Sequence, residues 1–346
     1  MPVSLYTEEH QALAAALGRF VEERIAPFAD TWETTGEVPG GVRREAGALG
    51  YLTAGQQDAV VELAVAEALG RCGAAGVAVA LLTTTAAVLP LLSEADGVAG
   101  CADLRERVAA GETVVTLAAA DDGTADRPVA RITATQTGGD VTLTGEEFAV
   151  PDARTAEAAL VLAQASGAAA LYLCHTAAPG WIPTATPAAL GHASAGRTDV
   201  TLDGVPAIRL GLSAEAVQRA LDRLRLMTAA AAVSGAWRTW ERTRDYALER
   251  EAFGRPIARF QVNRHALAEA AGRLTAARQL VHEAVWRLGT GREDRSLIAA
   301  ARRYATSTVM GVTDTCLQLY GGYGYAMEYD VQRDWRDARA DRGATP

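Results

Sequence analysis

The sequence predicts a mainly α-helical protein with a β-rich middle segment. Apolar residues recur at helical spacing near the N-terminus and again over long segments after residue 213. Between these segments, short runs rich in Val, Ile and Thr alternate with Gly, Asp and Pro, which is typical of strands joined by turns. We therefore expect an N-terminal helical domain (residues 1–111), a small antiparallel β domain (112–210) and a C-terminal four-helix bundle (211–346).

The N-terminal segment is expected to begin with a helix capped by Thr7. Glu8 and Glu9 would occupy its first turn, where the helix dipole favours carboxylates. One apolar face follows, formed by Leu13, Leu17, Phe20, Val21 and Ile25. Pro27 should end or bend this helix. Further helices are expected at residues 41–49, 59–71, 73–88 and 104–110.

Residues 73–92 form an uncharged run that resembles a membrane span in length. The run is rich in Ala and Thr, contains Pro90, and lacks arginine or aromatic anchors at its ends. A helix that is apolar on every side can also lie inside a large helical protein. We expect such a buried helix and no membrane association.

The remaining elements follow from the same patterns. Strands are expected at residues 113–117, 130–135, 141–144, 159–163, 169–174 and 200–205. Three long helices are expected at residues 214–250, 256–288 and 293–320, with Pro256 in the first turn of the second.

The composition excludes several kinds of chemistry. The 33 basic residues are all arginines, so catalysis through a lysine Schiff base and a lysine-containing phosphate loop are absent. The net charge of −9 disfavours general nucleic-acid binding. The four cysteines are far apart and the five histidines are scattered, so we expect no metal site, no disulfide framework and a cytoplasmic location.

Most arginines lie in the C-terminal part of the chain. Residues 237–346 contain 18 arginines and 14 acidic residues, whereas the rest of the chain is strongly acidic. This distribution suits an anionic ligand such as a nucleotide. Arginines paired with carboxylates on solvated helix faces are the alternative.

The first informative motif spans residues 250–261. Arg250 and Arg255 lie on either side of Gly254, and we expect one helix to end at Gly254 and the next to begin at Pro256. Arginines and free backbone N–H groups at such a junction suit a pyrophosphate. An ordinary helix–turn–helix would give the same pattern.

The second motif, Gln-Leu-Tyr-Gly-Gly-Tyr-Gly-Tyr, spans residues 318–325 at the end of the last long helix. Three glycines in four residues permit positive φ angles and a close approach of the backbone to a ligand. The motif is not a dinucleotide fingerprint of the strand–turn–helix kind, because a helix precedes it. A glycine helix cap is the alternative.

Together, and in this order, the two motifs resemble those of the acyl-CoA dehydrogenase family. The first resembles the family's Arg-x-x-Phe-Gly-Arg/Lys-x-Ile-x-x-x-Gln stretch, and the second its Gln-x-x-Gly-Gly-x-Gly-Tyr stretch. Residues 203–206 and 328–339 also fit, and the resemblance covers nearly the whole chain. In this family FAD lies at a subunit interface, with its ADP half against a neighbouring subunit. The resemblance therefore implies FAD contacts from Arg250, Phe253, Gln261, Gln318, Gly321 and Gly322.

The resemblance also implies an oxidoreductase that dehydrogenates acyl-CoA thioesters. In the family a glutamate removes the α-proton, a hydride passes from the β-carbon to the flavin, and an electron-transferring flavoprotein accepts the electrons. Asp222 and Arg225 resemble residues that contact CoA in the family. An intrahelical ion pair between them is the alternative.

The family's catalytic and flavin-ring positions are altered in this sequence. The glutamate positions fall on Thr345 and on Leu224, so we expect no catalytic residue in this chain. Ala119 and Ala125 replace hydroxyl residues that contact the flavin. Pro151 replaces another, and proline offers neither a hydroxyl nor a backbone N–H.

Three hypotheses follow. In the first, the chain is a non-catalytic subunit that lends the ADP half of the FAD site to a second acyl-CoA dehydrogenase-family chain in an α2β2 hetero-oligomer. Such pairs resemble those of the actinobacterial branch that degrades steroid side chains. In the second, the chain is a self-sufficient homo-oligomer of a natural-product pathway acting on an acyl-CoA or acyl-carrier thioester, with Asp222, Glu146 or Glu147 as base. In the third, it is a flavin-free scaffold.

Overall fold

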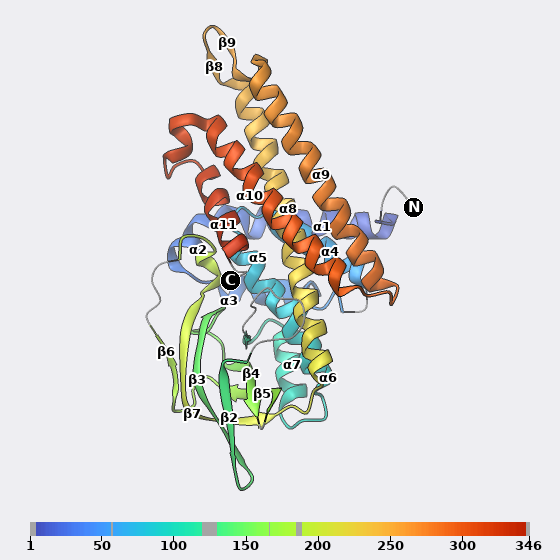
Figure 1. The fold of residues 1–346 in the computed structure, drawn as a ribbon, viewed down its shortest axis with the longest axis vertical. Coiled ribbons are helices and arrows are strands. Elements are labelled where there is room, and N and C mark those ends of the chain that lie inside the picture. Colours follow the sequence, from blue (N-terminus) through green and yellow to red (C-terminus); the bar gives the residue numbers. More distant parts are fainter. Residues whose placement is uncertain (1–4, 57, 120–129, 166, 185–188, 344–346) are drawn as a thin grey trace. The chain divides into compact units, whose positions relative to one another are not determined.

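The computed structural model describes residues 5–56, 58–119, 130–165, 167–184 and 189–343. It confirms a mostly helical fold with a β region between N-terminal and C-terminal helices (Figure 1). Contacts divide the chain into two compact units, and the described part of the first consists of residues 5–29, 59–75 and 225–343. The second contains residues 30–58 and 76–224. The N-terminal helices are thus shared between the units, and the domain boundaries at residues 111 and 210 stay a prediction.

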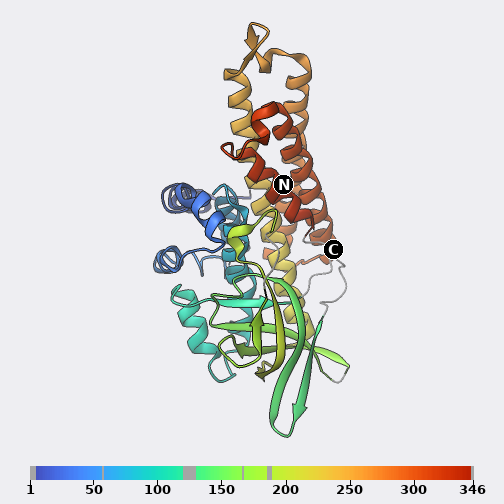
Figure 2. The same cartoon turned by 90° about the vertical axis from the view of Figure 1, so that its left-hand side faces the viewer.

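The first unit, called the helical unit here, is dominated by three long helices. Its elements are α1 (Glu8–Arg24), η1 (Ala26–Phe28), α4 (Ala59–Gly70), most of α8 (Ala214–Glu249), α9 (Gln261–Gly289), α10 (Arg295–Tyr320), η5 (Gly321–Tyr325) and α11 (Val331–Gly343). A small hairpin of β8 (Glu251–Ala252) and β9 (Arg255–Pro256) lies at the end of α8 and α9 (Figure 2). Helix α10 packs against both α9 and α11.

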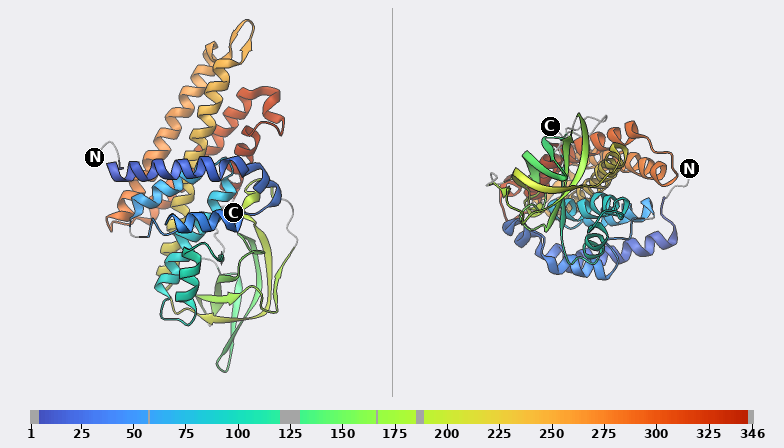
Figure 3. Two further views of the ribbon diagram at one scale, coloured as in Figure 1. Left: turned by 180° about the vertical axis from the view of Figure 1, so that it is seen from behind. Right: turned by 90° about the horizontal axis from the view of Figure 1, so that it is seen from below.

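Helix α1 begins as the sequence predicts. The hydroxyl of Thr7 accepts a hydrogen bond from the backbone N–H of His10 at 3.3 Å, which caps the helix. Its face bearing Leu17, Phe20 and Val21 is buried, and α1 packs against α4 (Figure 3).

Helices α4 and α8 cross at very short range. A Cβ atom added to Gly70 would overlap the backbone carbonyl of Ala231, so only glycine fits at this crossing. Beside it, the hydroxyl of Ser234 donates to the carbonyl oxygen of Glu67 at 2.7 Å.

The second unit, called the β unit here, contains a seven-stranded sheet. Its strands are β1 (Val115–Ala118), β2 (Ile132–Thr137), β3 (Asp140–Val150), β4 (Ala158–Ala165), β5 (Ala168–His175), β6 (Trp181–Pro183) and β7 (Thr198–Arg209). The strand order is β1-β4-β2-β3-β7-β5, and β5 also pairs with β4, so the sheet closes on itself. Its interior includes the fully buried Ile132, Leu143, Val161, Leu202 and Val205.

The expectation of a purely antiparallel sheet is wrong for two strand pairs. Strand β4 runs parallel to both β1 and β2, whereas the other pairings of this sheet are antiparallel. Alternation of apolar and polar residues identifies the buried face of a strand but carries no information on the direction of its neighbour. The sequence pattern therefore predicts where the strands lie but not the direction in which neighbouring strands run.

The β unit also contains helices, including the long apolar one. They are α2 (Ala29–Thr35), α3 (Gly40–Ala48), α5 (Ala75–Leu82), the π-helical η2 (Thr83–Val88), α6 (Leu89–Glu94) and α7 (Cys101–Ala109), and a short 3-10 turn η3 (Ala193–Ala195) precedes β7. Residues 75–94 are long and apolar enough to cross a membrane, but 89% of the most apolar window is buried inside the protein. This burial supports the interpretation as a core helix. The helix extends past the predicted end at residue 88, because Pro90 occupies the first turn of α6.

Candidate functional site

The junction between α8 and α9 is a hairpin and not the predicted direct helix–helix junction. Helix α8 ends at Glu249, and α9 begins at Gln261 after a short 3-10 turn, η4 (Ile257–Arg259). The prediction that a helix starts at Pro256 is therefore wrong. Pro256 pairs with Glu251 across the hairpin, and proline is tolerated at the edge of such a ladder.

A two-residue turn closes this hairpin. Phe253 and Gly254 both have positive φ angles, +53° and +78°, which is the pattern of a type I′ turn. Glycine adopts this conformation without cost, whereas phenylalanine is held there under strain. The turn places Phe253 at the outermost point, where 96% of the residue is exposed.

The two arginines of the hairpin segment each stack on an aromatic ring. The guanidinium carbon of Arg250 lies 5.2 Å from the ring centroid of Tyr323, and that of Arg255 lies 4.2 Å from that of Phe260. Within the part of the chain that the structure describes, neither guanidinium has a carboxylate partner. Stacking engages the face of a guanidinium and leaves its N–H edges available to an anion.

The glycine-rich motif lies beside Arg250. Tyr320 at the end of α10 stacks on Tyr246 of α8, with centroids 4.1 Å apart and planes 9° apart. Tyr329 contacts both Tyr320 and Tyr323, which extends this aromatic cluster to the ring under Arg250. The cluster explains how two motifs far apart in the sequence come to lie together.

The backbone of this motif is open on one side. Gly321 has a φ of +58° and ψ of −135°, a conformation that glycine alone adopts readily. Cβ atoms added at Gly321 or Gly322 would meet nothing within 4 Å, so the space beside them is free. By contrast, a Cβ at Gly324 would press on the carbonyl of Leu317. The first two glycines thus expose backbone, while the third serves internal packing.

Large apolar side chains are exposed in the same segments of the chain. We define the tip surface as the exposed Phe253, Val262, Tyr323, Tyr325 and Met327. Tyr325 is 94% exposed. Gln261 at the start of α9 and Gln318 in the last turn of α10 are also exposed. An exposed apolar surface of this kind marks a binding or subunit interface.

All six predicted FAD contacts are exposed, and Arg250 is in addition stacked on Tyr323. Sequence analysis named Arg255 with Arg250 as suited to a pyrophosphate but did not include it among the FAD contacts, and it did not single out Phe260 or Tyr323 as site residues. The short spacing of Arg255 and Phe260 was a usable signal, because an arginine and an aromatic residue close in sequence can stack. No such signal linked Arg250 to Tyr323.

The two residues that resemble CoA contacts of the family are placed differently. Asp222 and Arg225 lie one turn apart on α8 and are only 3% and 8% exposed. The carboxylate of Asp222 accepts a hydrogen bond from Gln218 at 2.9 Å. Both side chains are buried, and they do not belong to the tip surface.

The altered flavin-ring positions of the β unit form an internally bonded turn. The N–H of Ala149, whose φ is +52°, donates to Asp199 at 2.8 Å, and the carbonyl of Pro151 accepts from Thr116 at 2.5 Å. Next to them, buried Asp152 forms an ion pair with buried Arg43 at 2.8 Å. Ala125 and Thr345 lie outside the described residues.

Comparison with known proteins agrees with this architecture. Residues 7–96 match the model of the acyl-CoA dehydrogenase N-terminal domain, and residues 214–344 that of the acyl-CoA dehydrogenase C-terminal domain. Benzylmalonyl-CoA dehydrogenase of Aromatoleum aromaticum is 30% identical over 353 residues, covering 96% of this chain and 93% of that protein.

Solved structures show the same fold. Glutaryl-CoA dehydrogenase of Mycobacterium smegmatis, in complex with FADH2, has a TM-score of 0.89 at 20% identity and covers 97% of this chain and 90% of its own. Butyryl-CoA dehydrogenase of Megasphaera elsdenii has a TM-score of 0.87 at 22% identity, with 99% and 95% covered. The fold and matched domains define an oxidoreductase of the flavoprotein class. This chain belongs to the acyl-CoA dehydrogenase family.

Proposed function

We propose that this chain is a subunit of an FAD-dependent acyl-CoA dehydrogenase and lends the ADP half of the FAD site to a catalytic partner chain of the same family. The observation that carries the proposal is the pair of stacked guanidiniums, Arg250 and Arg255, which have no carboxylate partner among the described residues. They face outward from the chain next to exposed aromatic rings. Their free N–H edges suit an anionic ligand that a second chain holds from the other side.

The residues at the tip surface fit the ADP half of FAD. Arg250 and Arg255 would donate hydrogen bonds to the diphosphate, since guanidinium edges suit phosphate oxygens. Gly321 and Gly322 leave open space for a close backbone approach. Phe253 and Tyr325 supply exposed rings that an adenine or a partner chain would cover.

The residues of this chain do not supply the acid–base part of the reaction. When bound, FAD provides a hydride acceptor for the β-carbon of the thioester. Removal of the α-proton needs a carboxylate near the thioester. The two family positions for that base are Leu224 and Thr345. At the flavin-facing turn, Pro151 has no N–H and its carbonyl already accepts from Thr116. The partner chain would therefore hold the base and the flavin ring.

We further propose the setting of this activity. The assembly would be an α2β2 hetero-oligomer in the cytoplasm that oxidises an acyl-CoA or acyl-carrier thioester in lipid or steroid metabolism and passes electrons to an electron-transferring flavoprotein. A CoA thioester as substrate is supported by the name of the 30% identical relative, benzylmalonyl-CoA dehydrogenase. The exposure of the apolar tip surface in the single chain supports an oligomer.

The test compares the flavin spectrum of the chain purified alone with that of the chain co-purified with a family member encoded next to it. Flavin that appears only in the complex, and is bleached there by an acyl-CoA, supports the proposal. Stoichiometric flavin in the lone chain, bleached by an acyl thioester, replaces it with a self-sufficient homo-oligomeric dehydrogenase. Absence of flavin from both preparations leaves the scaffold hypothesis. In the complex, Arg250→Gln should lower flavin content, whereas Arg303→Gln on α10 should not.

A further inference from the structure

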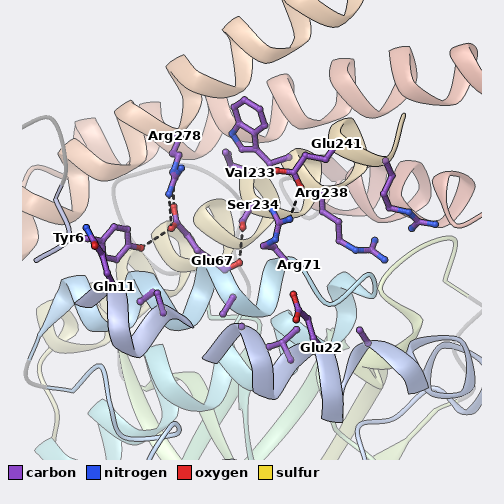
Figure 4. A pocket seen from close by; sticks show the side chains of 18 of the residues that line it. Tyr6, Gln11, Glu22, Glu67, Arg71, Val233, Ser234, Arg238, Glu241 and Arg278 are labelled. Carbon is purple, nitrogen blue, oxygen red and sulfur yellow. Dashed lines mark hydrogen bonds and ion pairs between the residues drawn. The ribbon is translucent and has the colours of Figure 1, made fainter. Parts of the chain in front are cut away.

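A second potential binding site lies elsewhere in the helical unit. A cavity of about 790 Å³ lies between α1, α4, α8 and α9 (Figure 4). None of its lining residues belongs to the tip surface. Its apolar lining combines the rings of Tyr6 and Trp237 with small residues and short aliphatic ones: Ala14, Gly18, Val21, Ala26, Ala64, Ala68 and Val233. A cavity of this size and lining is typical of a small-molecule site.

At one end of the cavity, Glu67 is fully engaged by protein groups. Its carboxylate accepts hydrogen bonds from the hydroxyl of Tyr6 at 2.7 Å, from Arg278 at 3.1 Å through two nitrogens, and from His282 at 2.8 Å. Burial alone would raise the pKa of Glu67, but the His282 hydrogen bond and the charge of Arg278 outweigh it and lower the pKa to about 2. Because Glu67, Arg278 and His282 bind one another, this end of the cavity offers a ligand no unpaired charge among the described residues.

The other end carries three arginines with many unused donors. Arg71 donates one hydrogen bond to Glu241 at 2.6 Å, and Arg242 donates one to Asp330 at 2.6 Å. Arg238 contacts acidic groups only at 3.8 and 3.9 Å, and its buried Nη1 has no hydrogen-bond partner among the described residues. Each guanidinium carries five N–H donors, so most of these donors have no protein partner among the described residues. Those of Arg71 and Arg242 are partly exposed to water, whereas Nη1 of Arg238 is buried.

Acidic residues balance the charge of the three arginines, because Glu22, Glu241 and Asp245 also line the cavity. Asp330 and Asp334 lie 3.8 and 3.9 Å from Arg238. Glu241 is paired with Arg71, and Asp245 with Arg244 at 2.7 Å. Glu22 on α1 is exposed and forms no ion pair within the described residues. Glu22 points toward the arginine end in Figure 4. Its unpaired negative charge would weaken the binding of an anion there.

We propose that this cavity binds an amphipathic anion, with an aliphatic body on the Ala14–Gly18 side and a terminal carboxylate or phosphate at Arg71, Arg238 and Arg242. The buried Nη1 of Arg238 favours an anionic acceptor group, because a buried donor without a partner is costly. The apolar lining favours an apolar body. The site is independent of the FAD contacts at the tip surface.

Steric blocking tests the location of the site. A side chain at Gly18 would meet nothing within 4 Å at its Cβ, so Gly18→Leu should fold and project into the cavity. Ala15→Leu is the matched control, because Ala15 is an exposed residue of the same helix and does not line the cavity. We expect decanoate, titrated into the full chain by calorimetry, to bind the wild type and Ala15→Leu equally and Gly18→Leu at least about tenfold more weakly. Equal binding to all three chains would overturn the proposal.

Ligand charge and arginine substitutions test the chemistry. Decanoate and decyl phosphate should both bind. Tighter binding of decanoate would indicate a fatty acid as the natural ligand, and tighter binding of decyl phosphate would indicate a phosphate ester. Decanol and decyltrimethylammonium should bind at least about tenfold more weakly, as should decanoate to Arg71→Gln or Arg242→Gln. Glu22→Gln should tighten decanoate binding, and the exposed Arg19→Gln should leave it unchanged. Binding of decanol as tight as that of decanoate would overturn the proposal.

Discussion

The guanidinium of Arg250, just after α8, lies over the ring of Tyr323 in η5, with 5.2 Å between its central carbon and the ring centroid. This contact joins the arginine motif to the glycine motif. It also orients the guanidinium so that its edges point away from the ring. The two motifs are separate in the sequence, and this contact brings them together in one candidate site.

Replacing Arg250 should therefore weaken flavin binding by the assembly. Arg250→Gln removes the charge and most N–H donors, and a charge-assisted hydrogen bond contributes about 1.5–3 kcal/mol. We expect the FAD dissociation constant of the complex to rise about 10- to 100-fold, measured by fluorescence of released flavin. Arg250→Lys should recover little, because an ammonium cannot stack and bridge in the same way. Unchanged flavin affinity in both variants would remove Arg250 from the site.

The hairpin turn should be sensitive to substitution at Gly254. Its φ of +78° is strained for any residue with a Cβ, so Gly254→Ala should destabilise the turn by about 1 kcal/mol and lower flavin retention. Gly272→Ala provides the matched control, since Gly272 is exposed in α9 and an added Cβ meets nothing within 4 Å. The control should raise stability by up to about 1 kcal/mol. The thermal stability of the two variants should therefore change in opposite directions, and only Gly254→Ala should lose flavin.

The crossing of α4 and α8 should not tolerate a side chain at Gly70. An added methyl overlaps the backbone carbonyl of Ala231, and backbone cannot move aside as a flexible side chain can. We expect Gly70→Ala to lower the free energy of unfolding by about 1–3 kcal/mol or more, as overpacking does. Urea denaturation followed by circular dichroism measures this change. A stability equal to that of Gly272→Ala would contradict the close crossing.

Glu67 should make stability depend on pH in the acid range. Because its pKa is lowered to about 2 from the ordinary value of 4.5, its contribution of about 3 kcal/mol is fully present above pH 4.5 and is lost as the pH falls toward 2. Glu67→Gln should destabilise the protein near neutral pH and reduce the pH dependence between 4.5 and 2. Denaturation curves of wild type, Glu67→Gln and the exposed control Glu23→Gln at several pH values test this. A wild-type slope retained in Glu67→Gln would assign the effect to other groups.

Local sequence signals predicted many elements of the fold correctly. The cap at Thr7, the buried helix that includes Pro90, and the long helices α8 and α10 each follow from residues close together in the chain. The hairpin at residues 251–256 was missed. The positive φ angles at Phe253 and Gly254 interrupt a pattern that otherwise predicts two helices. Such turns favour Asn, Asp or Gly at their first central position, so phenylalanine there does not indicate a turn.

The candidate site was only partly predictable for the same reason. The motif residues Arg250, Phe253 and Gln261 were identified from their order and spacing, and their exposure is consistent with that prediction for Phe253 and Gln261. Asp222 and Arg225 were also identified by resemblance, but burial on α8 depends on the surrounding helices and could not be seen in the sequence. The prediction that all of these residues contact ligands stays a prediction.

The sequence by itself determined the helical and β segments, the absence of lysine chemistry and the two motifs that indicate the family. These properties depend on residue identity and on spacing within one turn or strand. Only the tertiary structure decided which strands of the sheet run parallel, that Arg250 lies on Tyr323, and that Arg71, Arg238 and Arg242 share one cavity with Glu67. Each of these relationships joins residues that are distant in the chain, and their meeting depends on how whole helices and strands pack.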